Sequence, residues 1–344
     1  MSTMKEAMFY RKLAASKVGC ELCPRFCVIA EGETGFCGVR RNVKGRLCSL
    51  VYGKPVSIAI DPIEKKPLFQ FAPATRCLSL ATVGCNLRCS FCQNSSISQE
   101  YGAIHGEEMY PEEVIALAKQ HGVEGIAYTY TEPTVFYEYA FDIMKLAKKE
   151  GLYNVWVSNG YTNPEPIKTM ARYLDAVNVD LKGDDEFYRK VCGGLGIKPV
   201  FDALKAYVKN GVWVEVTNLI IPGHNDAPAA IKKLSAWVAE NLGESVPLHF
   251  SAFYPQYRLT SAKPTPAATL EKAVAIARKA GLRWVYAGNV LGNKYESTYC
   301  WKCGTKSIER MGFSVLSLEE KCPKCGTKID LRGMEWSRKA KRFK

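Results

Sequence analysis

Residues 83–94 read VGCNLRCSFCQN and place Cys85, Cys89 and Cys92 at a C-x3-C-x2-C spacing. Cysteine thiolates are the usual ligands of iron-sulfur clusters, and three of them bind only three of the four irons in a [4Fe-4S] cluster. The fourth iron then stays open to a substrate or cofactor. Structural zinc sites usually take four ligands as two separated pairs, so a three-thiolate zinc site fits poorly. The motif therefore predicts an open, catalytic [4Fe-4S] cluster.

Bulk composition favours a soluble globular protein. The chain has 344 residues, 47% of them hydrophobic and 24% charged, enough for one large domain plus appendages. No apolar run approaches the roughly 20 residues that cross a bilayer, and the first residues lack the apolar stretch of a secretory signal. We therefore expect a cytoplasmic protein without a membrane partner. In a reducing compartment, its fourteen cysteines are expected to bind metals rather than form disulfides.

Two further cysteine groups flank the central motif. The C-terminal group has the spacing C-x2-C-x18-C-x2-C, with a glycine after each pair that permits a tight turn around one ion. It predicts a structural zinc ribbon formed by Cys300, Cys303, Cys322 and Cys325. Three other cysteines stand alone and are interpreted as small buried hydrophobic residues, namely Cys48, Cys77 and Cys192.

The N-terminal group has a less decisive spacing, C-x2-C-x3-C-x9-C. It consists of Cys20, Cys23, Cys27 and Cys37. This spacing matches neither two zinc pairs nor the compact ferredoxin run of cysteines. Zinc and an auxiliary iron-sulfur cluster are both open for this group, and zinc is our first choice.

Hydrophobic periodicity predicts an α/β fold. Strands rich in β-branched and aromatic residues are expected at 77–83, 125–130, 154–159, 176–181, 213–220, 247–253 and 284–289. Amphipathic helices are expected between them, at 111–122, 134–151, 164–174, 200–211, 228–243 and 269–281. Such alternation fits a parallel β/α barrel, an open partial barrel or a doubly wound sheet.

The chain is accordingly divided into three parts. Residues 1–75 form an N-terminal Cys-rich metal-binding segment and a lead-in to the barrel. Residues 76–294 form the barrel, and residues 295–344 form a zinc-ribbon-like domain with a basic tail.

Five short sequence motifs carry a family resemblance, namely DPIEKKPLFQF (61–71), GCNLRCSFCQN (84–94), YTYTEPT (128–134), VSNGY (157–161) and NVDLKG (178–183). They resemble motifs of the radical S-adenosylmethionine (SAM) enzymes related to pyruvate formate-lyase activating enzymes. That branch includes the radical SAM component of the AmmeMemoRadiSam system. The resemblance implies a partial (β/α)6 TIM-like barrel of the radical SAM type, in which the open iron binds the amino and carboxylate groups of SAM.

Polar residues at expected strand ends are the candidate cofactor ligands, because the carboxyl ends of parallel strands form the active site of a barrel. Thr131 and Glu132 follow the second strand, where the family has a Gly-Gly-Glu-type turn that receives the ammonium group of SAM. This chain departs from the glycine-rich form, and Pro133 also suits the first turn of a helix. Ser158 and Asn159 follow the third strand.

Asp180 and Lys182 follow the fourth strand and project to the same side of its end. The resemblance implies that both residues, with Ser158, bind the carboxylate and ribose of SAM. The alternative is a structural salt bridge. Ile221 follows the fifth strand and belongs to an apolar lip suited to stacking an adenine.

Charge is concentrated outside the expected barrel. Of the formal charge of +13, residues 1–48 and 295–344 together hold +11, and WSRKAKRFK (336–344) is the densest stretch. A basic tail can bind nucleic acid, an acidic protein or neither. No RNA-binding motif is present, so nucleic acid is an unlikely partner and RNA modification a minority alternative.

The resemblance implies a radical SAM oxidoreductase or activase-like enzyme. A reduced cluster would cleave SAM to a 5'-deoxyadenosyl radical that removes hydrogen from an unidentified substrate, with electrons from a ferredoxin- or flavodoxin-type donor. One alternative is an activase of a glycyl-radical enzyme, and Memo-type and AMMECR-type proteins are candidate partners. A metal-binding interaction protein without catalysis is another class, which the intact cluster cysteines, Asp180 and Lys182 disfavour.

Overall fold

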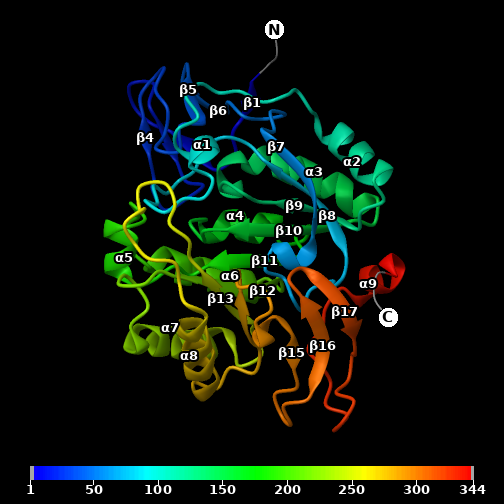
Figure 1. Cartoon of the computed structure of the whole chain (residues 1–344). Helices are drawn as coiled ribbons and strands as arrows, with labels where there is room; N and C mark the ends of the chain where they lie inside the picture. Colours follow the sequence, from blue (N-terminus) through cyan, green and yellow to red (C-terminus); the bar gives the residue numbers. More distant parts are fainter. Residues whose placement is uncertain (1–3, 342–344) are drawn as a thin grey trace.

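The seven expected strands are neighbours in one sheet. In the computed structural model, which describes residues 4–341, they are β8 (Arg76–Ala81), β9 (Gly125–Tyr128), β10 (Tyr153–Ser158), β11 (Ala176–Asp180), β12 (Trp213–Ile220), β13 (Leu248–Ala252) and β14 (Val285–Gly288). They pair in parallel and in sequence order. Because β14 is an edge of this sheet, the barrel is open, as a partial barrel requires (Figure 1).

An eighth strand, β7 (Ser57–Pro62), was not expected from the sequence. It pairs antiparallel with β8, from Ser57 opposite Ala81 to Pro62 opposite Arg76. Its side chains are mostly half-buried, so it lacks the continuous apolar run that marked the parallel strands. The lead-in assigned to residues 1–75 therefore already contributes a strand to the barrel sheet.

Helices cover the outside of this sheet (Figure 1). They are α2 (Pro111–Gln120), α3 (Tyr137–Lys149), α4 (Pro164–Met170), α5 (Asp185–Lys190), α6 (Lys198–Lys209), α7 (Pro228–Leu242) and α8 (Ala267–Lys279). The single-turn helix α1 (Ser95–Ser98) instead lies against the loop after β8, and short 3-10 turns are η1 (Ile63–Lys65), η2 (Pro133–Phe136) and η3 (Lys294–Glu296). The six expected helices all form. None of the helices described in residues 4–341 is long and apolar enough to cross a membrane.

The amino end of the barrel is closed by the segment 61–71. The fully buried carboxylate of Glu215 on β12 accepts hydrogen bonds from the backbone nitrogens of Phe69 and Gln70, both at 2.9 Å. His249 Nε2 on β13 lies 2.7 Å from the same carboxylate. These contacts fix the segment as a floor against β12 and β13.

The N-terminal segment forms two small antiparallel sheets beside the barrel. One consists of β1 (Lys5–Glu6), β6 (Arg46–Ser49) and β5 (Arg40–Val43), and the other of β2 (Tyr10–Lys12), β3 (Val18–Cys20) and β4 (Val28–Ile29). Arg40 donates to both carboxylate oxygens of Glu138 on α3, at 2.8 and 2.9 Å, and both side chains are buried. This ion pair attaches the segment to the barrel.

The C-terminal part lies at the opposite end of the molecule in Figure 1. Its strands β15 (Thr298–Tyr299), β16 (Lys306–Met311) and β17 (Ser314–Leu318) form an antiparallel sheet, followed by α9 (Met334–Ala340). Arg310 is buried and donates to the carbonyl of Phe69 at 2.6 Å, which ties this domain to the barrel floor. The last three residues of the expected basic tail, 342–344, lie outside the described residues.

Candidate active site at the carboxyl ends of the strands

The loop after β8 carries the three central cysteines. Gly84 precedes them with φ at 100°, and a Cβ there would lie 2.9 Å from the carbonyl oxygen of Cys37, so glycine is required. On the other side, the backbone nitrogens of Arg88 and Ser90 donate to the carbonyls of Cys192 and Val191, both at 2.9 Å. The loop is therefore held between the N-terminal segment and the segment after α5.

The cluster thiols have polar neighbours within the loop and beyond it. The backbone nitrogen of Leu87 lies 3.4 Å from Cys85 Sγ, and Asn159 Nδ2 lies 3.7 Å from the same sulfur. Cys92 Sγ lies 3.2 Å from the hydroxyl of Ser98. Burial and the charge of Glu132 raise the pKa of the Cys85 thiol, while the Leu87 N–H opposes that shift and favours thiolate, the form of cysteine that binds iron.

The three thiols are too widely separated for one ion. Within residues 4–341, one group of three or more Cys, His, Asp or Glu has all its ligand atoms within 4.8 Å of one another, and that group is the C-terminal one. Since each cysteine of an iron-sulfur cubane binds a different iron, wider separation is what such a cluster needs. The residues present at Cys85, Cys89 and Cys92 therefore fit a cluster.

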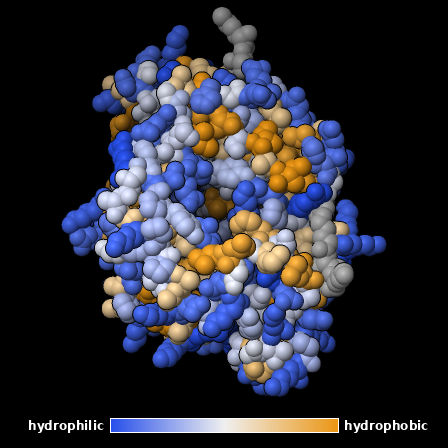
Figure 2. Space-filling view, in the orientation of Figure 1, coloured by the Kyte–Doolittle hydropathy of each residue, from blue (hydrophilic) through white to orange (hydrophobic). Residues whose placement is uncertain are grey.

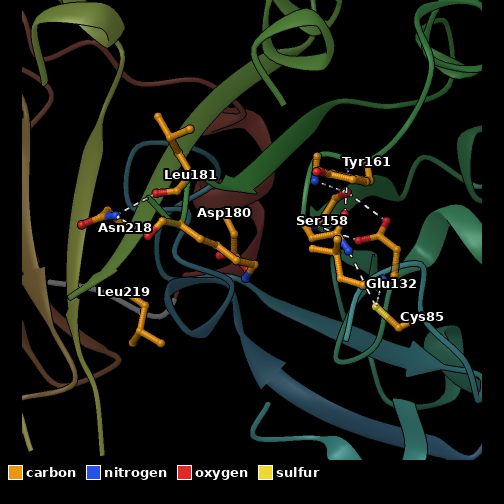
Figure 3. Close-up of polar contacts among 12 residues, drawn as sticks. Cys85, Glu132, Ser158, Tyr161, Asp180, Leu181, Asn218 and Leu219 are labelled. Atoms are coloured by element: carbon orange, nitrogen blue, oxygen red, sulfur yellow. Dashed lines mark hydrogen bonds and ion pairs between the residues drawn. The ribbon is translucent and has the colours of Figure 1, made fainter. Parts of the chain in front are cut away.

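Glu132 is the point where the loops after β9 and β10 meet (Figure 3). Its carboxylate is fully buried, and Oε1 accepts from Thr134 N at 3.0 Å, Thr134 Oγ1 at 2.6 Å and Ser158 Oγ at 2.9 Å. Oε2 accepts from Asn159 N at 2.8 Å. Burial raises the pKa of Glu132, and these hydrogen bonds oppose that shift. All four donors come from the protein at the ends of β9 and β10, so the Glu132 carboxylate holds these two loops together.

Asn159 transmits this arrangement to the cluster loop. Its Nδ2 donates to Asn86 Oδ1 at 2.9 Å and lies near Cys85, while its Oδ1 accepts from Tyr161 N at 2.8 Å. Asn86 in turn donates to the carbonyl of Tyr161 at 2.8 Å. Thr131 Oγ1 donates to the carbonyl of Thr82 at 2.9 Å, which links the ends of β9 and β8.

Asp180 and Lys182 form an ion pair beyond the end of β11, with Lys182 Nζ 2.7 Å from Asp180 Oδ2. Lys182 Nζ also lies 5.7 Å from the centre of the Phe91 ring in the cluster loop. Burial alone would lower the pKa of Lys182, but Asp180 and the thiols of Cys89 and Cys192 raise it well above its usual value. A fixed positive charge thus stands beside the cluster loop.

Ile221 lies next to this pair, but its side chain is fully buried. Its backbone nitrogen donates to Asn225 Oδ1 at 2.6 Å, and Asn225 Nδ2 donates to the carbonyl of Lys182 at 2.7 Å. Leu219, half-buried on β12, is one of two leucines drawn with Asp180 in Figure 3. The backbone of Ile221, and not its side chain, is therefore connected to Lys182, through Asn225.

Three contributors to the site were missed from the sequence. Asn86 and Asn225 hold loops, although neither spacing nor charge distinguishes them from other loop asparagines. Cys192, interpreted as an isolated buried residue, lies beside Cys89. Hydrogen bonding with Cys192, together with burial, raises the pKa of the Cys89 thiol. No local pattern joins residues 89 and 192.

The C-terminal cysteines form a compact group. Cys300 Sγ lies 3.6 Å from Cys325 Sγ, and Cys303 Sγ lies 3.4 Å from Cys322 Sγ. A tetrahedral zinc ion with Zn–S bonds of about 2.3 Å places its sulfur ligands about 3.8 Å apart. Hydrogen bonding to Thr327 lowers the pKa of Cys325 to about 6, which favours the metal-binding thiolate. This four-cysteine group is suited to one metal ion.

Comparison with known proteins relates the region that contains this site to a known family. A sequence profile described as the radical SAM superfamily matches residues 79–234, which run from β8 into α7. A protein of Methanocaldococcus jannaschii described as uncharacterized is 48% identical over 334 residues, 95% of this chain and 99% of the relative. Residues 79–234 of this chain are therefore a radical SAM domain. Such a domain marks an enzyme of radical chemistry and implies a [4Fe-4S] cluster and SAM as cofactors.

More distant similarity is to activating enzymes. A pyruvate formate-lyase-activating enzyme of Clostridium pasteurianum is 30% identical over 160 residues, which is 44% of this chain and 65% of that protein. A solved domain of a pyruvate-formate lyase-activating enzyme from Bacteroides vulgatus is 15% identical with a TM-score of 0.43, covering 48% of this chain and 99% of that one. Over those 160 residues, this chain is similar to the Clostridium pasteurianum activase.

We predict that Glu132→Ala destabilises the apo protein. The change leaves buried donors of Thr134, Ser158 and Asn159 without their charged acceptor, and each hydrogen bond to a charged group is worth about 1.5–3 kcal/mol. Urea denaturation should therefore show a loss of at least that size. Glu150→Ala, at the exposed end of α3, is the control and should leave the midpoint near that of the wild type. An equally stable Glu132→Ala protein would show that Glu132 does not organise these loops.

Proposed function

We propose that this chain cleaves SAM reductively and removes a hydrogen atom from a substrate C–H bond. The observation that carries the proposal is the wide separation of Cys85, Cys89 and Cys92, at the carboxyl ends of the strands of a radical SAM domain. When bound there, a reduced [4Fe-4S] cluster supplies the electron that cleaves SAM to methionine and a 5'-deoxyadenosyl radical. The protein's own residues then have to hold the ligands and keep water out.

The residues around the cysteines suit both tasks. The amide of Leu87 and the side chain of Asn159 donate toward Cys85, while Cys89 is buried. On the surface seen in Figure 2, a hollow lies near the centre, with apolar side chains above and below it. Such a hollow is suited to a ligand that must be shielded from solvent.

Lys182 and Asp180 are proposed to bind opposite groups of SAM. The charged Lys182 ammonium suits the methionine carboxylate, whereas the Asp180 carboxylate, which is more exposed, suits ribose hydroxyls. Ser158, Asn159, Thr131 and Glu132 are proposed to shape the remainder of the cofactor site, and the Ile221 backbone to hold its far wall. The contacts that support this are the hydrogen bonds that join these loops to one another and to Asn86.

The substrate is proposed to lie outside plain activase chemistry. The region shared with the Clostridium pasteurianum enzyme covers 44% of this chain, which is too short to include both the N-terminal and the C-terminal cysteine groups. We therefore favour a role in the AmmeMemoRadiSam system, with Memo-type and AMMECR-type partners and a ferredoxin- or flavodoxin-type electron donor. Activation of a glycyl-radical enzyme is the second candidate, favoured by the 30% identity to that activase.

The C-terminal group is proposed to bind zinc as a structural ion. Its sulfur separations of 3.4 and 3.6 Å are close to those around one tetrahedral zinc. Since it lies beyond the barrel floor, at the end opposite the cluster loop, this ion would stabilise the ribbon rather than take part in catalysis.

We expect simultaneous replacement of Cys85, Cys89 and Cys92 by alanine to abolish SAM cleavage, because the three proposed iron ligands are gone. The assay is anaerobic release of 5'-deoxyadenosine by the reduced, reconstituted protein. Cys48→Ala, which removes a buried thiol of β6 outside the three groups, should cleave SAM like the wild type. Retained SAM cleavage in the triple variant would show that these three cysteines do not bind the catalytic cluster. With a candidate protein partner, an EPR doublet split by a glycyl α-hydrogen identifies an activase.

For Lys182→Ala we expect SAM affinity to fall about 10- to 150-fold, the equivalent of losing a hydrogen bond of about 1.5–3 kcal/mol to a charged group. The cluster should stay intact, since Lys182 does not bind iron. Titration of SAM while following the EPR spectrum of the reduced cluster measures the affinity. Lys190→Ala, an exposed lysine of α5, is the matched control and should bind SAM normally. Unchanged affinity in Lys182→Ala would leave its ion pair with Asp180 a purely structural one.

A further inference from the structure

We propose that Cys20, Cys23, Cys27 and Cys37 bind a second [4Fe-4S] cluster, with all four irons held by protein. The sequence alone left zinc and a cluster open and made zinc the first choice. The proposal goes beyond the barrel chemistry, because it concerns a separate set of ligands on a separate segment. It rests on the spatial separation of the thiols and on their neighbours.

The three cysteine groups of this chain separate into two kinds. The C-terminal thiols all lie within 4.8 Å of one another, the spacing of ligands around a single ion. In the region that the structure describes, no three of the four N-terminal thiols meet this condition, and neither do the three barrel thiols. The N-terminal group therefore shares the wider arrangement of the barrel group, which belongs to a [4Fe-4S] site in this superfamily.

A cavity lies between the N-terminal thiols. Its volume is ≈ 20 Å³, and all four cysteines line it. Its other walls include Leu22, Phe36, Asn86 and Val135, so the cavity is largely apolar with few competing ligands. Because one apolar cavity is lined by all four cysteines, they are placed to hold one shared inorganic group.

The neighbours of these thiols suit a buried, negatively charged cluster. The backbone nitrogen of Phe36 donates to Cys27 Sγ at 3.5 Å. Arg25 and Arg40 both line the cavity; Arg40 also pairs with Glu138, so the positive charge near the thiols comes mainly from Arg25. Arg25 Nε also donates to the carbonyl of Asn86 at 3.1 Å, inside the barrel cluster loop. The second site is therefore built against the first.

The test uses the full chain with its barrel cysteines removed. In Cys85→Ala/Cys89→Ala/Cys92→Ala, reconstituted anaerobically with iron and sulfide and then desalted, we expect about four iron atoms and about four acid-labile sulfides per chain. Zinc should be about one per chain, from the C-terminal group. The reduced protein should show a cluster EPR signal that added SAM does not change, since no open iron remains.

Two further variants on that background locate the cluster. Adding Cys23→Ala and Cys27→Ala should remove the iron and the EPR signal while leaving the zinc. Adding Cys48→Ala, the matched buried thiol on β6, should leave iron, sulfide and zinc unchanged. Zinc at about two per chain, with iron and sulfide absent from the triple variant, would overturn the proposal and restore the zinc interpretation.

The wild type provides an independent reading if the triple variant does not fold. It should hold about eight irons per chain, and Cys23→Ala/Cys27→Ala alone should reduce this to about four. In that variant the remaining cluster should still respond to SAM, so failure of the second site is distinguished from failure of the barrel site. A wild-type content of about four irons and about two zinc ions would contradict the proposal.

Discussion

The buried carboxylate of Glu132 is the constraint on which the site depends. A charged group taken out of water costs several kcal/mol unless donors replace the lost solvent. Here the backbone and side chains of Thr134, Ser158 and Asn159 replace it. Because these donors follow β9 and β10, satisfying one carboxylate fixes two strand-end loops at once. Asn159 then fixes the position of Cys85 through Asn86.

Both flanking segments are attached to the barrel by buried arginines, which makes the barrel the common support of all three cysteine groups. Arg40 pairs with Glu138 on α3, and Arg310 donates to Phe69 in the barrel floor. The two flanking segments contact different ends of the barrel. The N-terminal segment also contacts the cluster loop, at Gly84 and through Arg25, whereas the C-terminal ribbon contacts the opposite end. The N-terminal thiols are therefore the ones placed to influence the barrel cluster.

Local sequence was sufficient for the elements and for the cluster motif. Parallel strands are buried on both faces, so they appear as continuous apolar runs, and a three-cysteine motif within eight residues needs no distant partner. Strand β7 was not predicted because its side chains are mostly half-buried and give no clear alternation of buried and exposed positions. The contact of Cys192 with Cys89 and the hydrogen bonds of Glu132 could not be predicted from the sequence, because they join residues that are distant along the chain. The metal at Cys20, Cys23, Cys27 and Cys37 could not be predicted because zinc and iron both bind thiolate, and the separation of the thiols in space is not visible in the sequence.

The central claim is that an open iron on Cys85, Cys89 and Cys92 binds SAM directly. Electron-nuclear double resonance on the reduced cluster tests it, with SAM labelled by 15N at the methionine amino group and 17O at the carboxylate. The account predicts hyperfine coupling of both labels to the cluster, and its absence in the triple cysteine variant. A wild-type spectrum without coupling, at SAM concentrations that saturate binding, would contradict the account.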